Sequence, residues 1–133
     1  MRLSRKSEYA CLALIELAQH YNKGYLRTAD IASARKIPRT YLEQILLILK
    51  RTGYVGSARG AEGGYKLSKP PEEITLAEIL RLMDGALAPV ESASKYFYEH
   101  TPIENSEKLL DIFRDIRTYI SEKMEKTTFA ELI

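Results

Sequence analysis

The chain has 133 residues, 45% of them apolar, which is enough for one domain with its own core and an added oligomerisation element. A single cysteine, Cys11, excludes an internal disulfide and a cysteine-rich zinc site, and no segment approaches the roughly 20 apolar residues of a membrane span. The net charge of +2 is the sum of a basic first half and an acidic second half. Residues 1–69 carry 13 Lys and Arg against 5 Asp and Glu, whereas residues 70–133 carry 7 Lys and Arg against 13 Asp and Glu. We therefore expect a soluble, cytoplasmic protein whose basic half binds a polyanion such as nucleic acid.

Three helices are predicted in the first half of the chain. Apolar residues at helical spacing indicate a helix over 7–21. Residues 25–27 are expected to form a short strand. Thr28, a good N-cap, then begins a second helix that runs to about Arg35. Pro38 suits the first position of a third helix, because its missing N–H would have no partner there.

The third helix, residues 38–51, has two different faces. Its buried stripe is expected to contain Leu42, Ile45, Leu46 and Leu49. The other side chains face solvent or a ligand, and they are Arg39, Thr40, Glu43, Gln44, Lys50 and Arg51.

A β-hairpin follows the third helix. Residues 54–58 and 65–67 have strand composition, and the glycine-rich segment between them supplies the positive φ angles of a hairpin loop. Arg59 stands at the tip. The order helix, turn, helix and hairpin predicts a winged helix-turn-helix, with the helix-turn-helix at 28–51 and the wing at 54–67. In such a module the second helix enters a DNA major groove, and the wing arginine reaches a minor groove.

The acidic half begins with a well-marked helix. Thr75 and Glu78 make a capping box, and Ile74 and Ile79 are spaced as a hydrophobic staple. This helix should end at Asp84-Gly85. Residues 86–104 have no clear period and are predicted to be a loop or short helical turns.

A long amphipathic helix is predicted over 106–126, with a second capping box, Thr128 and Glu131, beginning a terminal turn. A helix of about 20 residues spans roughly 30 Å, which is longer than a small winged-helix core can cover. We therefore expect a mainly α protein in which residues 1–84 bind DNA and residues 85–133 provide a linker and a dimerisation helix. The apolar side chains assigned to the dimer contact are Leu109, Ile112, Phe113, Ile116, Tyr119 and Ile120.

Several motifs occur in the order and spacing of one known family, namely Met1-Arg-Leu-Ser4, Tyr41-Leu-Glu-Gln44, Gly53-Tyr-Val55, Arg59-Gly-x-x-Gly-Gly-Tyr65, Ile74-Thr75 and Thr128-Phe-Ala-Glu-Leu132. Through them the chain resembles the Rrf family (type two) of bacterial winged-helix regulators, which includes IscR, CymR and NsrR. The resemblance covers nearly the whole chain. It implies a homodimeric transcriptional regulator, expected to be a repressor, that reads a palindromic operator on double-stranded DNA.

Two features depart from parts of this family. Cluster-binding members carry three cysteines between the helix that here ends near Asp84 and the long helix, whereas residues 85–105 contain none. We therefore expect no iron-sulfur cluster, no other cofactor and no metal, as in the CymR-type branch. The resemblance then leaves three kinds of input signal open: a protein partner, a small molecule or an oxidisable thiol. The second departure is Leu47-Ile48, where relatives tend to carry more polar residues; the alternatives for this pair are an extension of the core and a contact with the other subunit.

The candidate DNA-binding residues lie in the first half of the chain: Lys6, Tyr9, Thr28, Arg39, Thr40, Tyr41, Glu43, Gln44, Lys50, Arg51, Ser57, Arg59, Gly60 and Tyr65. Glu43 fits a carboxylate that accepts from a cytosine N4, and the alternative is an exposed salt bridge. Arg59 could instead be an ordinary solvated loop residue. Cys11 is either a core residue or a redox sensor.

The chain offers no catalytic constellation. The glycine-rich segment lacks the Lys-Ser/Thr ending of a phosphate-binding loop, and no nucleophile has a base and an orienting group at a recognisable spacing. We therefore expect a DNA-binding protein that is not an enzyme. The alternative is a winged-helix interaction module that binds a metabolic enzyme, and the basic first half argues against it.

Overall fold

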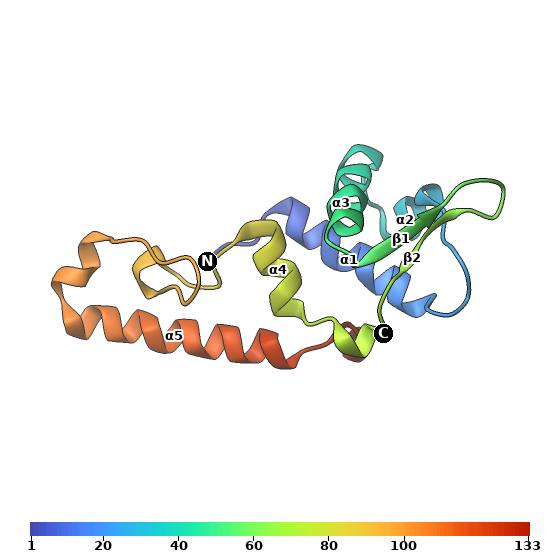
Figure 1. Ribbon diagram of the computed structural model, residues 1–133. Helices are drawn as coiled ribbons and strands as arrows, with labels where there is room; N and C mark the ends of the chain where they lie inside the picture. Colours follow the sequence, from blue (N-terminus) through green and yellow to red (C-terminus); the bar gives the residue numbers. More distant parts are fainter.

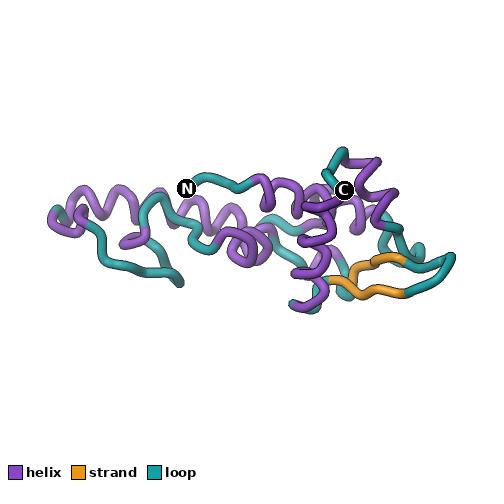
Figure 2. Tube along the Cα trace, turned by 90° about the horizontal axis from the view of Figure 1, so that it is seen from above, coloured by secondary structure: helices purple, strands orange, loops and turns teal.

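The computed structural model describes all residues from Met1 to Ile133, and it is elongated, with the hairpin at one end and the start of the long helix at the other (Figures 1 and 2). No helix is long and apolar enough to cross a membrane. The main elements, in chain order, are α1 (Arg5–Gln19), α2 (Thr28–Arg35), α3 (Arg39–Arg51), β1 (Val55–Ala58), β2 (Gly64–Leu67), α4 (Leu76–Asp84) and α5 (Glu107–Lys126).

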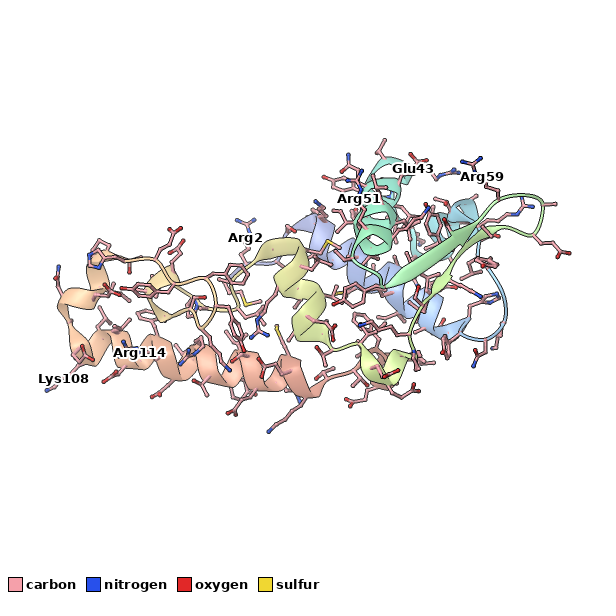
Figure 3. All side chains as sticks on the ribbon, in the orientation of Figure 1. Arg2, Glu43, Arg51, Arg59, Lys108 and Arg114 are labelled. Carbon is pink, nitrogen blue, oxygen red and sulfur yellow. The ribbon has the colours of Figure 1, made fainter.

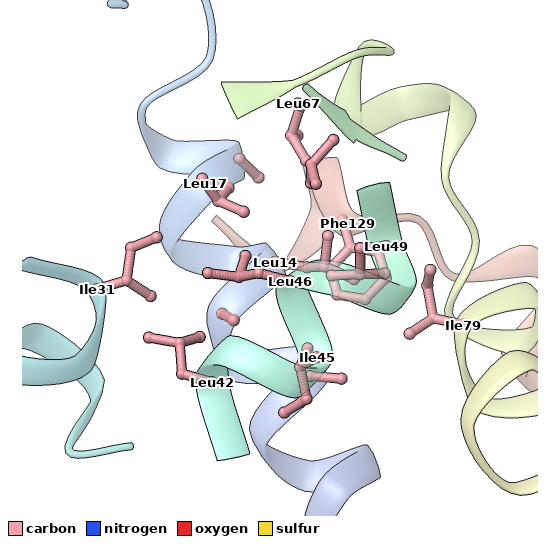
Figure 4. Packing of buried hydrophobic residues seen from close by; sticks show 14 of the residues in the cluster. Leu14, Leu17, Ile31, Leu42, Ile45, Leu46, Leu49, Leu67, Ile79 and Phe129 are labelled. Atoms are coloured by element: carbon pink, nitrogen blue, oxygen red, sulfur yellow. The ribbon is translucent and has the colours of Figure 1, made fainter. Parts of the chain in front are cut away.

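Helices α1, α2 and α3 pack around one apolar core, to which the hairpin, α4 and the C-terminal turn also contribute (Figure 4). The predicted stripe of α3 is confirmed, because its apolar side chains have no exposed surface. Residue Ile31 of α2 and Ile37 of the turn are also buried. Burying one face of α3 in this way leaves its other face in solvent. The α3 stripe consists of Leu42, Ile45, Leu46 and Leu49.

The predicted starts of α1, α2 and α3 are wrong by one or two residues. Helix α1 begins at Arg5 because the Ser4 side chain caps it by accepting from the Ser7 backbone N–H. Arg27, which is still extended at φ −73° and ψ 146°, precedes α2, so Thr28 is the first helical residue and caps nothing with its side chain. Pro38 likewise lies just before α3 and not inside it.

The hairpin is formed as predicted. Strands β1 and β2 pair antiparallel, with Val55 opposite Leu67 and Ala58 opposite Gly64. Val55 and Leu67 are buried, so the base of the hairpin belongs to the core. The expected strand at 25–27 is a single bridge between Leu26 and Tyr65.

Helix α4 has the predicted capping box: the Thr75 hydroxyl accepts from the Glu78 N–H, and the Glu78 carboxylate accepts from the Thr75 N–H. The Tyr54 hydroxyl also donates to this carboxylate, at 2.6 Å. Burial alone would raise the pKa of Glu78, but these hydrogen bonds outweigh it and hold the pKa below its usual value. Glu78 therefore connects the start of α4 to the hairpin base. Gly85 ends the helix at φ +88°.

Helix α5 confirms the predicted long helix, and the segment before it contains two short 3-10 turns, Glu91–Ala93 and Pro102–Asn105. The apolar residues that the sequence assigns to the dimer contact lie on two faces of α5. Phe113 and Ile120 are half-buried within the protomer, and Ile120 packs against a small cluster that includes Leu80 of α4. A wide apolar stripe on a 20-residue helix covers both an inner and an outer face, and sequence spacing alone did not separate them.

The C-terminal turn returns to the winged-helix core. Phe129 has no exposed surface and belongs to the same apolar cluster as α1 and α3. Its N–H donates to the Ile74 carbonyl at 3.0 Å, and Thr75 and Thr128 form a bridge. The predicted capping box of Thr128 and Glu131 is absent, because the Glu131 N–H donates to the Thr128 carbonyl in a 3-10 turn and the Thr128 side chain caps nothing.

Candidate nucleic-acid interface

Helix α3 presents one continuous exposed face. It follows a tight turn in which Lys36 adopts the left-handed conformation at φ +54° and the buried Ile37 anchors the chain. All but one of the exposed residues were candidates from the sequence, and the exception is Leu47. The exposed residues are Arg39, Thr40, Tyr41, Glu43, Gln44, Leu47, Lys50 and Arg51.

Glu43 and Arg39 form an ion pair one turn apart, with 3.6 Å between Arg39 Nε and Glu43 Oε1. Both side chains are more than half exposed. An ion pair of this kind contributes only about 0.3–0.5 kcal/mol, so the Glu43 carboxylate can exchange Arg39 for a donor on a ligand. The pair keeps both groups extended from the same side of α3.

The wing tip is held tight by glycine. Gly60 has φ +100°, and a side chain at Gly63 would bring a Cβ within 2.3 Å of the Ala58 carbonyl oxygen. Arg59 is exposed beside these residues, and Ser57 is exposed on β1. The short loop therefore projects Arg59 away from the hairpin.

The wing is also fixed to the start of α2. Leu26 and Tyr65 exchange two backbone hydrogen bonds of 2.8 and 2.7 Å. A Cβ at Gly64 would lie 2.1 Å from the Leu26 carbonyl oxygen, so the two chains can approach this closely only at a glycine. The Arg27 guanidinium donates to the Ala61 carbonyl in the loop. Arg27 was not a candidate from the sequence, because its role depends on a loop more than 30 residues away.

The remaining candidates flank α3. The rings of Tyr9 and Tyr41 lie 5.3 Å apart between centroids and connect α1 to α3. Tyr41 is exposed, whereas four other candidates are half-buried: Lys6, Tyr9, Thr28 and Tyr65.

The candidates of α3 and the wing share one side of the molecule. Figure 3 shows Glu43, Arg51 and Arg59 on the same upper side, while Lys108 and Arg114 lie at the far end of α5. Helix α3 and the wing thus present exposed polar side chains on one side of the molecule.

Cys11 lies in α1 between the two apolar clusters. Burial, together with the charge of Asp84, raises the pKa of its thiol to about 11. The thiol is therefore protonated at neutral pH, which disfavours thiolate chemistry and supports the core interpretation over the redox one.

A family model described as "Iron-dependent Transcriptional regulator", Rrf2, matches residues 3–133. The chain is 32% identical over 132 residues to the HTH-type transcriptional regulator CymR of Bacillus subtilis, covering 99% of this chain and 89% of that protein. It is 31% identical to IscR of Erwinia tasmaniensis, covering all of this chain and 79% of that protein.

The residues of this chain do not fit an iron centre of the kind that the family description suggests. No group of three or more His, Cys, Asp or Glu side chains is arranged to hold a metal ion. The segment between α4 and α5 has no cysteine, and its His100 instead contacts Glu104 on the surface. Cys11 is a single protonated thiol in another helix. An iron-sulfur cluster requires several thiolates, which this segment cannot supply.

The fold agrees with that of solved relatives over almost the whole chain. The CymR structure from B. subtilis, described as the global cysteine regulator of that organism, superposes with a TM-score of 0.80 at 32% identity and covers 99% of this chain and 95% of that one. IscR of T. potens superposes with a TM-score of 0.77 at 26% identity, covering 99% and 85%. The chain belongs to the Rrf2 family of winged-helix, DNA-binding transcriptional regulators.

Proposed function

We propose that two copies of this chain bind a palindromic operator, with α3 of each in a major groove and Arg59 of each wing in the adjacent minor groove. The observation that carries this proposal is the common side of α3 and the wing, where the exposed polar residues and Arg59 project together (Figure 3). The basic first half of the chain supplies a field that attracts phosphates.

Specificity is assigned to the first turns of α3. Glu43 and Gln44 are exposed on the side that would enter the groove. A carboxylate can accept from a cytosine N4, and an amide can pair with an adenine edge. We assign phosphate contacts to Arg51 and Lys50, which are exposed at the other end of α3, because such contacts position the helix without reading sequence.

The dimer is assigned to the outer face of α5. Four exposed apolar side chains follow one another on this face at steps of three and four residues. They are Leu109 (41% exposed), Ile112 (56%), Ile116 (42%) and Tyr119 (72%). An apolar row of this length on a monomer is an aggregation hazard unless a partner covers it. Two copies related by a two-fold axis through α5 would carry two recognition helices, which must lie roughly 34 Å apart to meet successive major grooves.

A bound dimer covers the DNA beneath it, which is the simplest way to repress transcription. We therefore infer that the regulator acts as a repressor. The domain division proposed from the sequence, 1–84 for DNA and 85–133 for dimerisation, is kept with one qualification: Phe129, which follows the C-terminal end of α5, packs in the core of the first part and joins that end of the dimer helix to the DNA-binding part.

Selection of bound duplexes from random DNA tests the proposal. We expect two inverted half-sites about one helical turn apart. Arg59→Ala should weaken binding to the selected site by about 1–3 kcal/mol. Lys108→Ala, which removes the same charge at the far end of α5, should bind like the parent. Equal affinities for Arg59→Ala and the parent at the same salt concentration would refute the wing assignment.

A further inference from the structure

Leu47 is an exposed apolar residue on the recognition helix. Its side chain is 44% exposed, whereas the four apolar residues of the buried α3 stripe have no exposed surface. It belongs to neither apolar cluster and is not among the side chains packed against them. Packing within the protomer therefore does not account for a leucine at this position.

Leu47 shares its face of α3 with the candidate base readers. The spacing i, i+3, i+4 and i+7 places four exposed residues on one side of α3, namely Thr40, Glu43, Gln44 and Leu47. Thr40 and Leu47 are separated by about 10 Å along the helix axis, less than the roughly 12 Å width of a major groove. A helix that inserts Glu43 and Gln44 into the groove therefore brings Leu47 in with them.

The chemistry of the groove restricts what Leu47 can recognise. A leucine side chain has no donor or acceptor, and the apolar group on the base edges of a major groove is the C5-methyl of thymine. We propose that Leu47 packs against a thymine methyl in each half-site and so specifies thymine at one position. This inference rests on the proposed insertion of α3 into the major groove.

Replacing thymine with uracil tests this contact, because uracil lacks only the methyl group. In the operator selected by the parent protein, each thymine is replaced singly and binding is measured by fluorescence anisotropy. Burying one methyl group corresponds to about a fourfold change in affinity. We expect one thymine per half-site at which uracil weakens binding by about fourfold.

Leu47→Ala completes a double-mutant cycle. It should weaken binding to the thymine operator, and uracil at the identified position should then have no further effect. Alanine is a better helix former than leucine and the site is exposed, so α3 should remain intact. Leu132→Ala, at an exposed leucine of the C-terminal turn, is the matched control and should keep the full sensitivity to uracil.

The outcomes separate this inference from the proposed function. If the parent selects a palindrome but uracil weakens Leu47→Ala as much as the parent, or no single uracil matters, the thymine contact is refuted and the operator-binding function stands. If the parent selects no sequence at all, both are refuted.

Discussion

Replacing Ile116 with aspartate should separate the two subunits of the proposed dimer. Ile116 is 42% exposed in one protomer and lies in the apolar row of Leu109, Ile112 and Tyr119. Burying the exposed half of such a side chain stabilises by about 1 kcal/mol, so the eight side chains of a two-fold seam contribute about 8 kcal/mol before the cost of lost translational and rotational freedom is subtracted.

The substitution removes the apolar side chain at position 116 from both subunits, and it places one unpaired carboxylate from each subunit in the apolar seam. We expect a loss of at least about 4 kcal/mol, or a roughly thousand-fold weaker dimer, with loss of operator binding. Sedimentation velocity over a concentration series measures the effect. Thr118→Asp, which adds the same charge on the exposed polar side of α5, is the control. An Ile116→Asp protein that sediments as the parent does and binds operator normally would show that the dimer interface lies elsewhere.

Three further changes probe the core, the capping box and the absence of thiolates. Phe129→Ala should lower the free energy of unfolding by about 3–5 kcal/mol, because the ring is fully buried; an unchanged urea midpoint would remove the C-terminal turn from the core. Glu78→Gln should lower stability by about 1 kcal/mol at pH 7. Because folding lowers the pKa of Glu78, this difference should shrink as the pH falls below 4.5 and the parent carboxylate takes up a proton, and a constant difference across that range would contradict the assignment. The purified protein should be colourless, and anaerobic treatment with iron and sulfide should give no stable cluster absorbance; a stable absorbance would mean that Cys11 or other ligands suffice.

Local signals in the sequence were enough to predict the helix-turn-helix, the hairpin and the start of α4. Glycines at Gly60 and Gly63 mark a loop that other residues cannot form, and Thr75 and Glu78 satisfy each other within one helical turn. The buried stripe of α3 was also predictable, because one helix packed on one core repeats every three to four residues. Each of these features depends on residues close in sequence.

Features that depend on distant contacts were missed or misplaced. Thr28 resembles an N-cap, but the cap is one residue earlier, at Arg27, whose guanidinium donates to the wing loop and whose neighbour Leu26 pairs with Tyr65. Thr128 and Glu131 have capping-box spacing, yet the Glu131 N–H donates to the Thr128 carbonyl in a 3-10 turn whose start is paired with the chain around Thr75. The inner and outer faces of α5 could be separated only once α4 was placed against it.

Operator binding as a function of salt concentration tests the proposed interface most directly. The binding constant of the parent should fall steeply and linearly on a logarithmic plot, with a slope of about 0.9 for each phosphate that the dimer neutralises. Arg59→Ala should bind more weakly and reduce that slope by about 1 for each half-site. A variant with the affinity and the slope of the parent would contradict the account, because the wing would then lie outside the contact with DNA.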